Sequence, residues 1–135
     1  MKGEGVYGPE KMFYILDKNN QPYPMDNMRA FGLYMAGAER SVGISVFSDP
    51  DGNEIARVST VFLAIDHGHG LEEFPVLFET MIFSGNKDID DYQERCCFYV
   101  DALEMHDRVV EDLSIKLGDA TVETAYPLKE LSEKA

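Results

Sequence analysis

The chain has 135 residues, 44% of them hydrophobic and 11% aromatic, with 25 acidic against 12 basic residues and a net charge of −13. This length and apolar content predict one globular domain and argue against intrinsic disorder. A strongly negative field repels phosphate backbones and anionic membrane surfaces, which argues against direct binding to nucleic acid or to a membrane. The charge is instead typical of a solvated surface, or of an acidic face that docks a basic partner.

The cysteines and the N-terminal residues give indications of the cellular compartment of the protein. Cys96 and Cys97 are adjacent, and adjacent cysteines seldom meet the geometry of an unstrained disulfide, so both thiols are predicted to be reduced. Residues 1–10 contain three glycines and a proline, which predicts a flexible lead-in, and they contain no apolar run of signal-peptide length. These features favour a cytoplasmic protein.

The first 83 residues predict four strands and one helix. Residues 11–17 form a short β-rich run, and Asp26 is a candidate N-cap for a short helix. Residues 42–48 and 54–66 are β-rich runs on either side of a Pro-Gly turn, which predicts an antiparallel hairpin. Residues 76–83 return after a loop to form a second hairpin. The last two runs are apolar at alternate and intervening positions, which is typical of central strands covered on both faces.

A periodic run near the C-terminus predicts the main helix. Asp101, followed three residues later by Glu104, predicts the start of this helix, and Gly118 predicts its end. Residues 121–126 predict a short edge strand. The apolar stripe of the helix consists of Leu103, His106, Val110, Leu113 and Leu117.

These elements predict a single α+β domain over residues 11–126, with a mainly antiparallel sheet of four or five strands. The C-terminal helix is expected to pack on one face of the sheet, and a shorter helix comes from the N-terminal third. Residues 127–135 are predicted to be a C-terminal tail.

The loop that follows residue 65 carries side chains of metal-binding types. Asp66, His67 and His69 lie close to Glu72 and Glu73, and imidazoles and carboxylates are ligands of zinc and other transition metals. The spacing matches no diagnostic metal motif, so a ligand-contacting loop and a simple polar turn are the alternatives. We expect no cofactor, with a divalent metal held by Asp66, His67 and His69 as the alternative.

Glu79 is a candidate because it shares a strand face with apolar residues, where a charge is costly unless it is paired. A histidine, Arg95 or a bound ligand is the predicted partner, and a solvent-facing strand is the alternative.

His106 lies on the apolar helix stripe, where a lone histidine is usually a satisfied core residue. If the helix crosses the sheet, His106 instead joins one polar pocket, in which the arginine suits a carboxylate or a phosphate. The predicted ligand-binding residues are Thr60, Asp66, His67, Glu79, Arg95 and His106.

Three blocks of the sequence carry a resemblance: VSTVFLAIDH, PVLFETMIFSG and DYQERCCFYVDALEMHDRVVEDL. Together they cover residues 57–113, and they resemble a group of small uncharacterised bacteriophage and prophage proteins with the pattern VSTVFLGxDH, LFETMVF, QxR and a later histidine. The polar positions of that pattern are occupied here by Asp66, His67, Glu79, Thr80, Arg95 and His106. This chain differs in having Ala64 for the usual glycine, and two cysteines after Arg95 where the group more often has Tyr-Ser.

The resemblance implies a phage accessory role in an infected or lysogenic bacterial host. The leading hypothesis is a non-enzymatic protein that binds a host protein or sequesters a small, anionic ligand, as in counter-defence. This hypothesis allows for a homo-oligomer and assigns no catalytic residue. An alternative is a metal-dependent hydrolase in which Asp66, His67 and His69 hold the ion and Glu79 or Glu73 acts as the base. A further alternative is an acidic mimic of nucleic acid.

Overall fold

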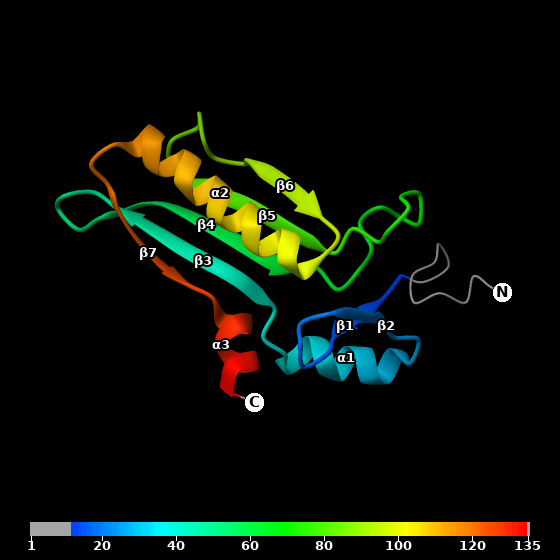
Figure 1. The fold of residues 1–135 in the computed structure, drawn as a ribbon. Helices are drawn as coiled ribbons and strands as arrows, with labels where there is room; N and C mark the ends of the chain where they lie inside the picture. The colour runs from blue at the N-terminus through cyan, green and yellow to red at the C-terminus, as the bar shows by residue number, and fades with distance from the viewer. Residues whose placement is uncertain (1–11, 135) are drawn as a thin grey trace.

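The computed structural model describes residues 12–134 as a single α+β domain, so the predicted flexible lead-in at residues 1–10 lies outside the described residues. A five-stranded antiparallel sheet with the order β6-β5-β4-β3-β7 carries helix α2 across one face (Figure 1). A small unit of β1, β2 and α1 lies beyond one end of this sheet. The elements are β1 (Tyr14–Leu16), β2 (Pro22–Pro24), α1 (Met28–Gly37), β3 (Ser41–Ser48), β4 (Glu54–Phe62), β5 (Phe78–Ser84), β6 (Gln93–Cys96), α2 (Tyr99–Leu117), β7 (Thr121–Ala125) and α3 (Pro127–Lys134).

Both predicted hairpins are confirmed, because β3 pairs with β4 and β4 pairs with β5 in antiparallel register. The predicted edge strand is confirmed as β7, which pairs with β3. Strand β6, in contrast, was not predicted, since Gln93, Glu94 and Arg95 have little intrinsic strand preference. Pairing with β5 holds these residues in the sheet.

Helix α2 confirms the main predicted helix but begins earlier than its capping pattern indicates. The helix starts at Tyr99, and its N-cap Phe98 makes no side-chain capping hydrogen bond, so the capping role predicted for Asp101 is wrong. Gly118 ends the helix as predicted, with a positive φ of 66° that a side chain would strain. The residues that α2 buries against the sheet are Ala102, Met105, His106, Val109 and Leu113.

Residues 127–134 form α3 where the sequence predicted a tail. Leu128 is 5% exposed and packs into the cluster of Tyr14, Phe31 and Phe62 that joins the N-terminal unit to the sheet. The side-chain amide of Asn20 also donates to the Leu128 carbonyl. The apolar signal of this helix is weak, which is why the sequence pattern did not reveal it.

The two faces of the large sheet differ. Ser45, Thr60 and Thr80 point toward α2, and the residues beside them in each strand therefore point away from α2. We call this second surface the open face: its side chains come from Ile44, Val46, Arg57, Ser59, Val61, Glu79, Met81, Phe83, Arg95 and Glu123. Strands β4 and β5 were expected to be covered on both faces, but no helix among residues 12–134 packs on the open face, where Phe83 is 48% exposed. Across the same residues, no helix is both long enough and apolar enough to cross a bilayer.

Candidate functional site

Asp66 organises the loop between β4 and β5. Its carboxylate is 3% exposed and accepts three backbone hydrogen bonds, from Gly68 at 2.7 Å, Val76 at 2.9 Å and Gly70 at 3.0 Å. A buried carboxylate with this many backbone donors is satisfied within the protein. The geometry therefore assigns Asp66 to holding the loop closed.

The two loop histidines do not converge on Asp66. The Nδ1 atom of His67 donates to the Ile65 carbonyl at 2.8 Å, and His69 is an exposed turn residue with a positive φ of 54°. Glu73, one of the two predicted bases, is exposed on the same loop. Within residues 12–134, no three histidine, cysteine or acidic side chains are grouped as a metal site would require.

Ala64 marks a strained turn just before this loop. Its φ is +70°, and the residue is fully buried. A side chain in this left-handed region costs about 1–2 kcal/mol, whereas glycine adopts it freely.

Replacing Asp66 with alanine is expected to lower the free energy of unfolding by about 1–3 kcal/mol, because three partly buried backbone N–H groups lose their acceptor. Hydrogen exchange should accelerate first at the amides of Gly68, Gly70 and Val76. Replacing the exposed Glu72 in the same loop with alanine is the control and should leave those amides protected. Unchanged exchange in the Asp66 variant would contradict the role assigned here.

Glu79 has the partner that its position demands. The Nε atom of Arg95, its cross-strand neighbour, donates to Glu79 Oε2 at 2.8 Å, and the Gln93 amide donates to the same oxygen. The carboxylate is only 8% exposed. Of the three partners considered from the sequence, a histidine, Arg95 and a bound ligand, the structure pairs Glu79 with Arg95, on the open face.

His106 is the centre of a buried chain of hydroxyl groups beneath α2. Its Nε2 lies 2.8 Å from Ser45 Oγ, and its Nδ1 lies 2.7 Å from Thr60 Oγ1. The chain continues from Ser45 to Thr124 at 2.7 Å and from Thr60 to Thr80 at 2.5 Å. The hydroxyls can donate or accept, so they satisfy a neutral imidazole in either tautomer. Burial lowers the pKa of His106, against a smaller opposing effect of Asp107.

The single polar pocket predicted from the sequence is not formed. Thr60 and His106 do meet, but Glu79 follows the opposite side of β5 from Thr80 and so lies on the other face of the sheet. The sheet itself therefore separates the Glu79–Arg95 pair from the His106 chain. Side chains alternate between the two faces along each strand, but this alternation separates Glu79 from His106 only once the face that α2 covers is known.

The two cysteines show none of the features of nucleophiles. Both are free thiols, and burial, which is the largest influence, raises the pKa of Cys96 to about 12 and also raises the pKa of Cys97. A thiol that stays protonated at neutral pH is a poor nucleophile. Cys96 instead packs against the core cluster that contains Phe78 and Ala102.

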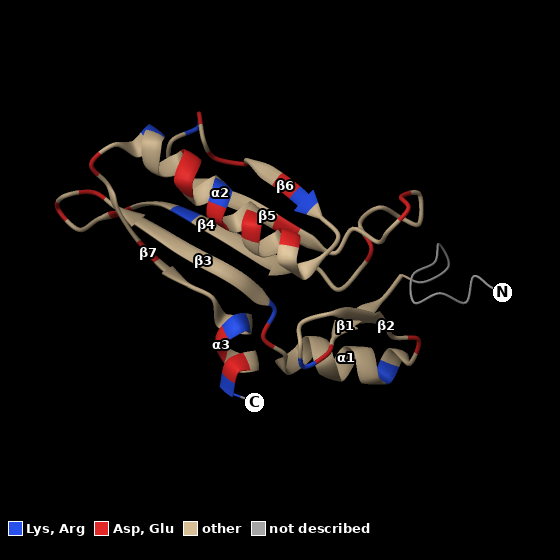
Figure 2. Cartoon of the chain, viewed as in Figure 1, with Lys and Arg blue, Asp and Glu red and all other residues tan. Residues whose placement is uncertain are grey.

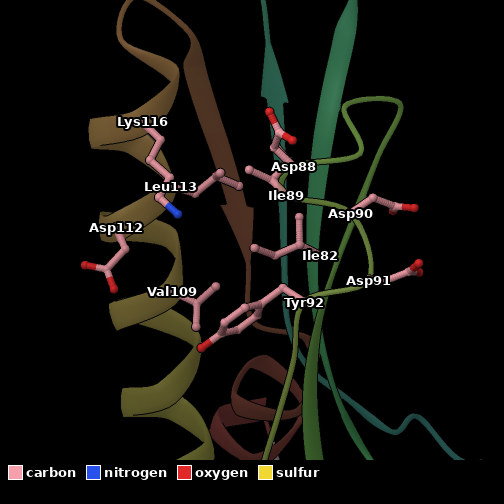
Figure 3. A pocket seen from close by; sticks show the side chains of 10 residues that line it. All are labelled: Ile82, Asp88, Ile89, Asp90, Asp91, Tyr92, Val109, Asp112, Leu113 and Lys116. Atoms are coloured by element: carbon pink, nitrogen blue, oxygen red, sulfur yellow. The ribbon is translucent and has the colours of Figure 1, made fainter.

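A pocket of about 270 Å³ lies between α2 and the loop of residues 85–92, which we call the acidic loop. Figure 3 shows Ile82, Ile89, Val109 and Leu113 converging in this pocket, beside the ring of Tyr92. The carboxylates of Asp90, Asp91 and Asp112 point outward around it in the same view. The pocket thus combines an apolar interior with a rim on which four aspartates, the fourth being Asp88, outnumber one lysine, Lys116.

Local hydrogen bonds hold the acidic loop in this position. Asp90 accepts from the Ser84 backbone amide at 2.9 Å, and the Asp91 amide donates to the Ile82 carbonyl at 3.2 Å. Ile89 is consequently kept at 9% exposure against α2. The sequence contains one overlooked signal for this pocket, namely a lone isoleucine in a run of aspartates, since an apolar residue there needs a surface to pack against.

The negative charge extends from the pocket along α2. Figure 2 shows acidic residues along the outward side of this helix and in the loops beside it. Arg108, the basic residue in the middle of the helix, is bound to Glu94 of β6 and so adds little uncompensated positive charge. The exposed carboxylates of α2 are those of Asp101, Glu104, Asp107, Glu111 and Asp112.

Fold and pocket together define a small helix-on-sheet α+β domain with an acidic helix side. The chain matches no protein-family model, and neither a curated protein nor a solved structure is detectably similar to it.

Proposed function

We propose that the protein is a phage-type accessory protein that acts by binding, and that its acidic side captures a positively charged amphipathic segment of a host protein. The pocket between α2 and the acidic loop carries the proposal, because it offers an apolar anchor site flanked by Asp112 on α2 and by Asp88, Asp90 and Asp91 on the loop. An apolar residue of the partner would fill the pocket. Lysine or arginine residues on either side of it would face the aspartates on the rim.

The size of the pocket supports a protein segment over a free metabolite. Pockets for drug-sized ligands occupy roughly 300–1,000 Å³, whereas this pocket has about 270 Å³, which suits one or two side chains. Anchoring a few apolar residues of an amphipathic helix in a groove is a common mode of peptide recognition. The negative rim also favours a cationic partner over the anionic ligand considered from the sequence, and Arg95 is already engaged by Glu79.

The test is an NMR titration with a synthetic amphipathic helical peptide that carries one leucine face and flanking lysines. Binding should shift the amides of Ile82, Ile89 and Val109, and it should weaken as salt is raised, because the attraction is screened. An otherwise identical peptide with glutamates in place of lysines should not bind.

Charge reversal of the rim supplies the matched variants. The double variant Asp88→Lys and Asp112→Lys is expected to weaken peptide binding at least about tenfold, or about 1.4 kcal/mol, at low salt. The control Glu130→Lys changes the charge on α3, far from the pocket (Figure 1), and should bind within about twofold of wild type. Shifts confined to other surfaces, or equal losses in the rim and control variants, would refute the proposal.

A further inference from the structure

The open face of the sheet has the composition of an interface. Its central rows place Ile44 beside Ser59 and Met81, Val46 beside Arg57 and Phe83, and Val61 beside Glu79. Phe83 is 48% exposed, so a large ring is left in contact with water. Strands that are apolar on both faces normally have a second layer over each face.

The charges of the open face nearly cancel one another. Arg95 is bound to Glu79 on this face, and Arg57 is bound to Glu54 at its edge. Together with Glu123, these charged side chains are two arginines and three glutamates. The face therefore carries a formal charge of only −1, although the whole chain carries −13.

We propose that the open face binds a second copy of this chain in a symmetric, face-to-face dimer. Two copies with a charge of −13 repel each other most strongly along α2 and the acidic loop. The nearly neutral open face lets them approach with far less repulsion, because Glu79 and Glu54 on it are already paired with arginines. A strongly basic partner would find little electrostatic attraction on this face and would bind the acidic side more favourably.

The area available suits a dimer of low affinity. The five strands, in sheet order, have 4, 7, 9, 8 and 5 residues. At about 3.4 Å per residue and about 4.8 Å between strands, the face measures roughly 20 by 22 Å. Two such faces would cover about 900 Å² in projection, which is the size of weak or transient protein interfaces. The dimer is thus expected to dissociate on dilution.

Salt distinguishes this interface from the proposed peptide site. Screening weakens the attraction of a cationic peptide to the acidic side, but it also weakens the repulsion between two negatively charged copies. Self-association through the open face should therefore become tighter as ionic strength rises, the reverse of peptide binding. Since the dimer uses the other side of the sheet, failure of either proposal leaves the other standing.

Sedimentation equilibrium of the full chain tests the dimer at about 0.05 M and about 0.5 M salt. The variants Phe83→Lys and Val46→Lys should each weaken dimerisation at least about tenfold. Each substitution makes the chain less negative, so added repulsion between copies cannot explain a loss. Ile115→Lys is the matched control, because Ile115 is an exposed apolar residue of α2 at 76% and undergoes the same change of charge.

The expected result is a wild-type dimer that tightens with salt, two weakened open-face variants, and a control within about twofold of wild type. Circular dichroism would verify that all four proteins are folded. A wild-type protein that stays monomeric at both salt concentrations would overturn the proposal. Equal weakening by Phe83→Lys and Ile115→Lys would overturn it as well.

Discussion

Replacing Gly43 with alanine is expected to lower the free energy of unfolding by about 2–3 kcal/mol, a large effect for one added methyl group. A Cβ atom at this position would lie 2.8–2.9 Å from three atoms of the His106 ring. The ring has little room to move, because it is fully buried and both of its nitrogens are hydrogen-bonded. Overpacking here should therefore break contacts on both sides of the imidazole.

A double-mutant cycle isolates this contact. His106→Ala alone is expected to cost about 3 kcal/mol, since it leaves a cavity and removes one partner each from Ser45 and Thr60. In that background the new methyl group enters empty space, so Gly43→Ala should become nearly neutral. Urea unfolding of the four proteins should give a coupling free energy of at least about 1.5 kcal/mol.

Gly32 provides the control for the alanine substitution. It lies within α1, and a Cβ atom there would meet nothing within 4 Å. Gly32→Ala should therefore raise the free energy of unfolding by about 0.5–1 kcal/mol, through helix propensity alone. Additive costs for Gly43→Ala and His106→Ala would show that the close approach is relieved by movement elsewhere.

The parts of the fold that were predicted correctly are those in which a local pattern and the tertiary contacts agree. The runs around Phe47, Val58 and Ile82 are β-rich and separated by turn residues, so the two hairpins could be predicted without knowledge of the core. Strand β6 and helix α3 lack such patterns. Their structure depends on pairing with β5 and on burial of Leu128, which are long-range contacts that composition does not reveal.

The candidate site shows the same limit of sequence reasoning. An acid on an apolar strand face needs a partner, and this argument placed Arg95, the partner that the structure shows, among the three candidates for Glu79. The same reasoning did not reveal that His106 lies on the opposite face of the sheet from Glu79. The pocket at Ile89 could not be predicted either, because it exists only where the acidic loop meets the C-terminal half of α2.

The division of the sheet into two faces also explains how one small, strongly acidic chain could provide the two binding surfaces that we propose. Polar groups beneath α2 are satisfied internally by the His106 chain, which leaves the outer side of α2 free to carry charge. On the other side of the sheet, the Glu79–Arg95 pair neutralises the charge that the apolar face would otherwise expose. Charge and apolar area are thereby assigned to opposite sides of the molecule.

Stability is expected to fall as the pH is lowered below about 6.5, the ordinary pKa of histidine, because burial lowers the pKa of His106 in the folded protein. Between these two pKa values the unfolded chain binds a proton that the folded protein does not bind. Unfolding then takes up a proton, so acid favours the unfolded state. The contribution of the neutral imidazole is complete above the unfolded pKa and is lost as the pH falls toward the folded pKa, with a slope of up to about 1.4 kcal/mol per pH unit.

Comparison with His106→Leu separates this effect from the titration of the many carboxylates, which both proteins share. Urea unfolding at about pH 7.5 and about pH 5.5 should show wild type losing more stability than the variant between the two conditions, by about 1 kcal/mol. At the higher pH the wild type should be the more stable protein, since leucine leaves Ser45 and Thr60 with one partner fewer. Equal losses of stability in the two proteins would contradict this prediction, because the folded protein would then take up the proton at His106 as readily as the unfolded chain does. The hydroxyl chain around His106 would in that case have to be solvated enough to hold an imidazolium.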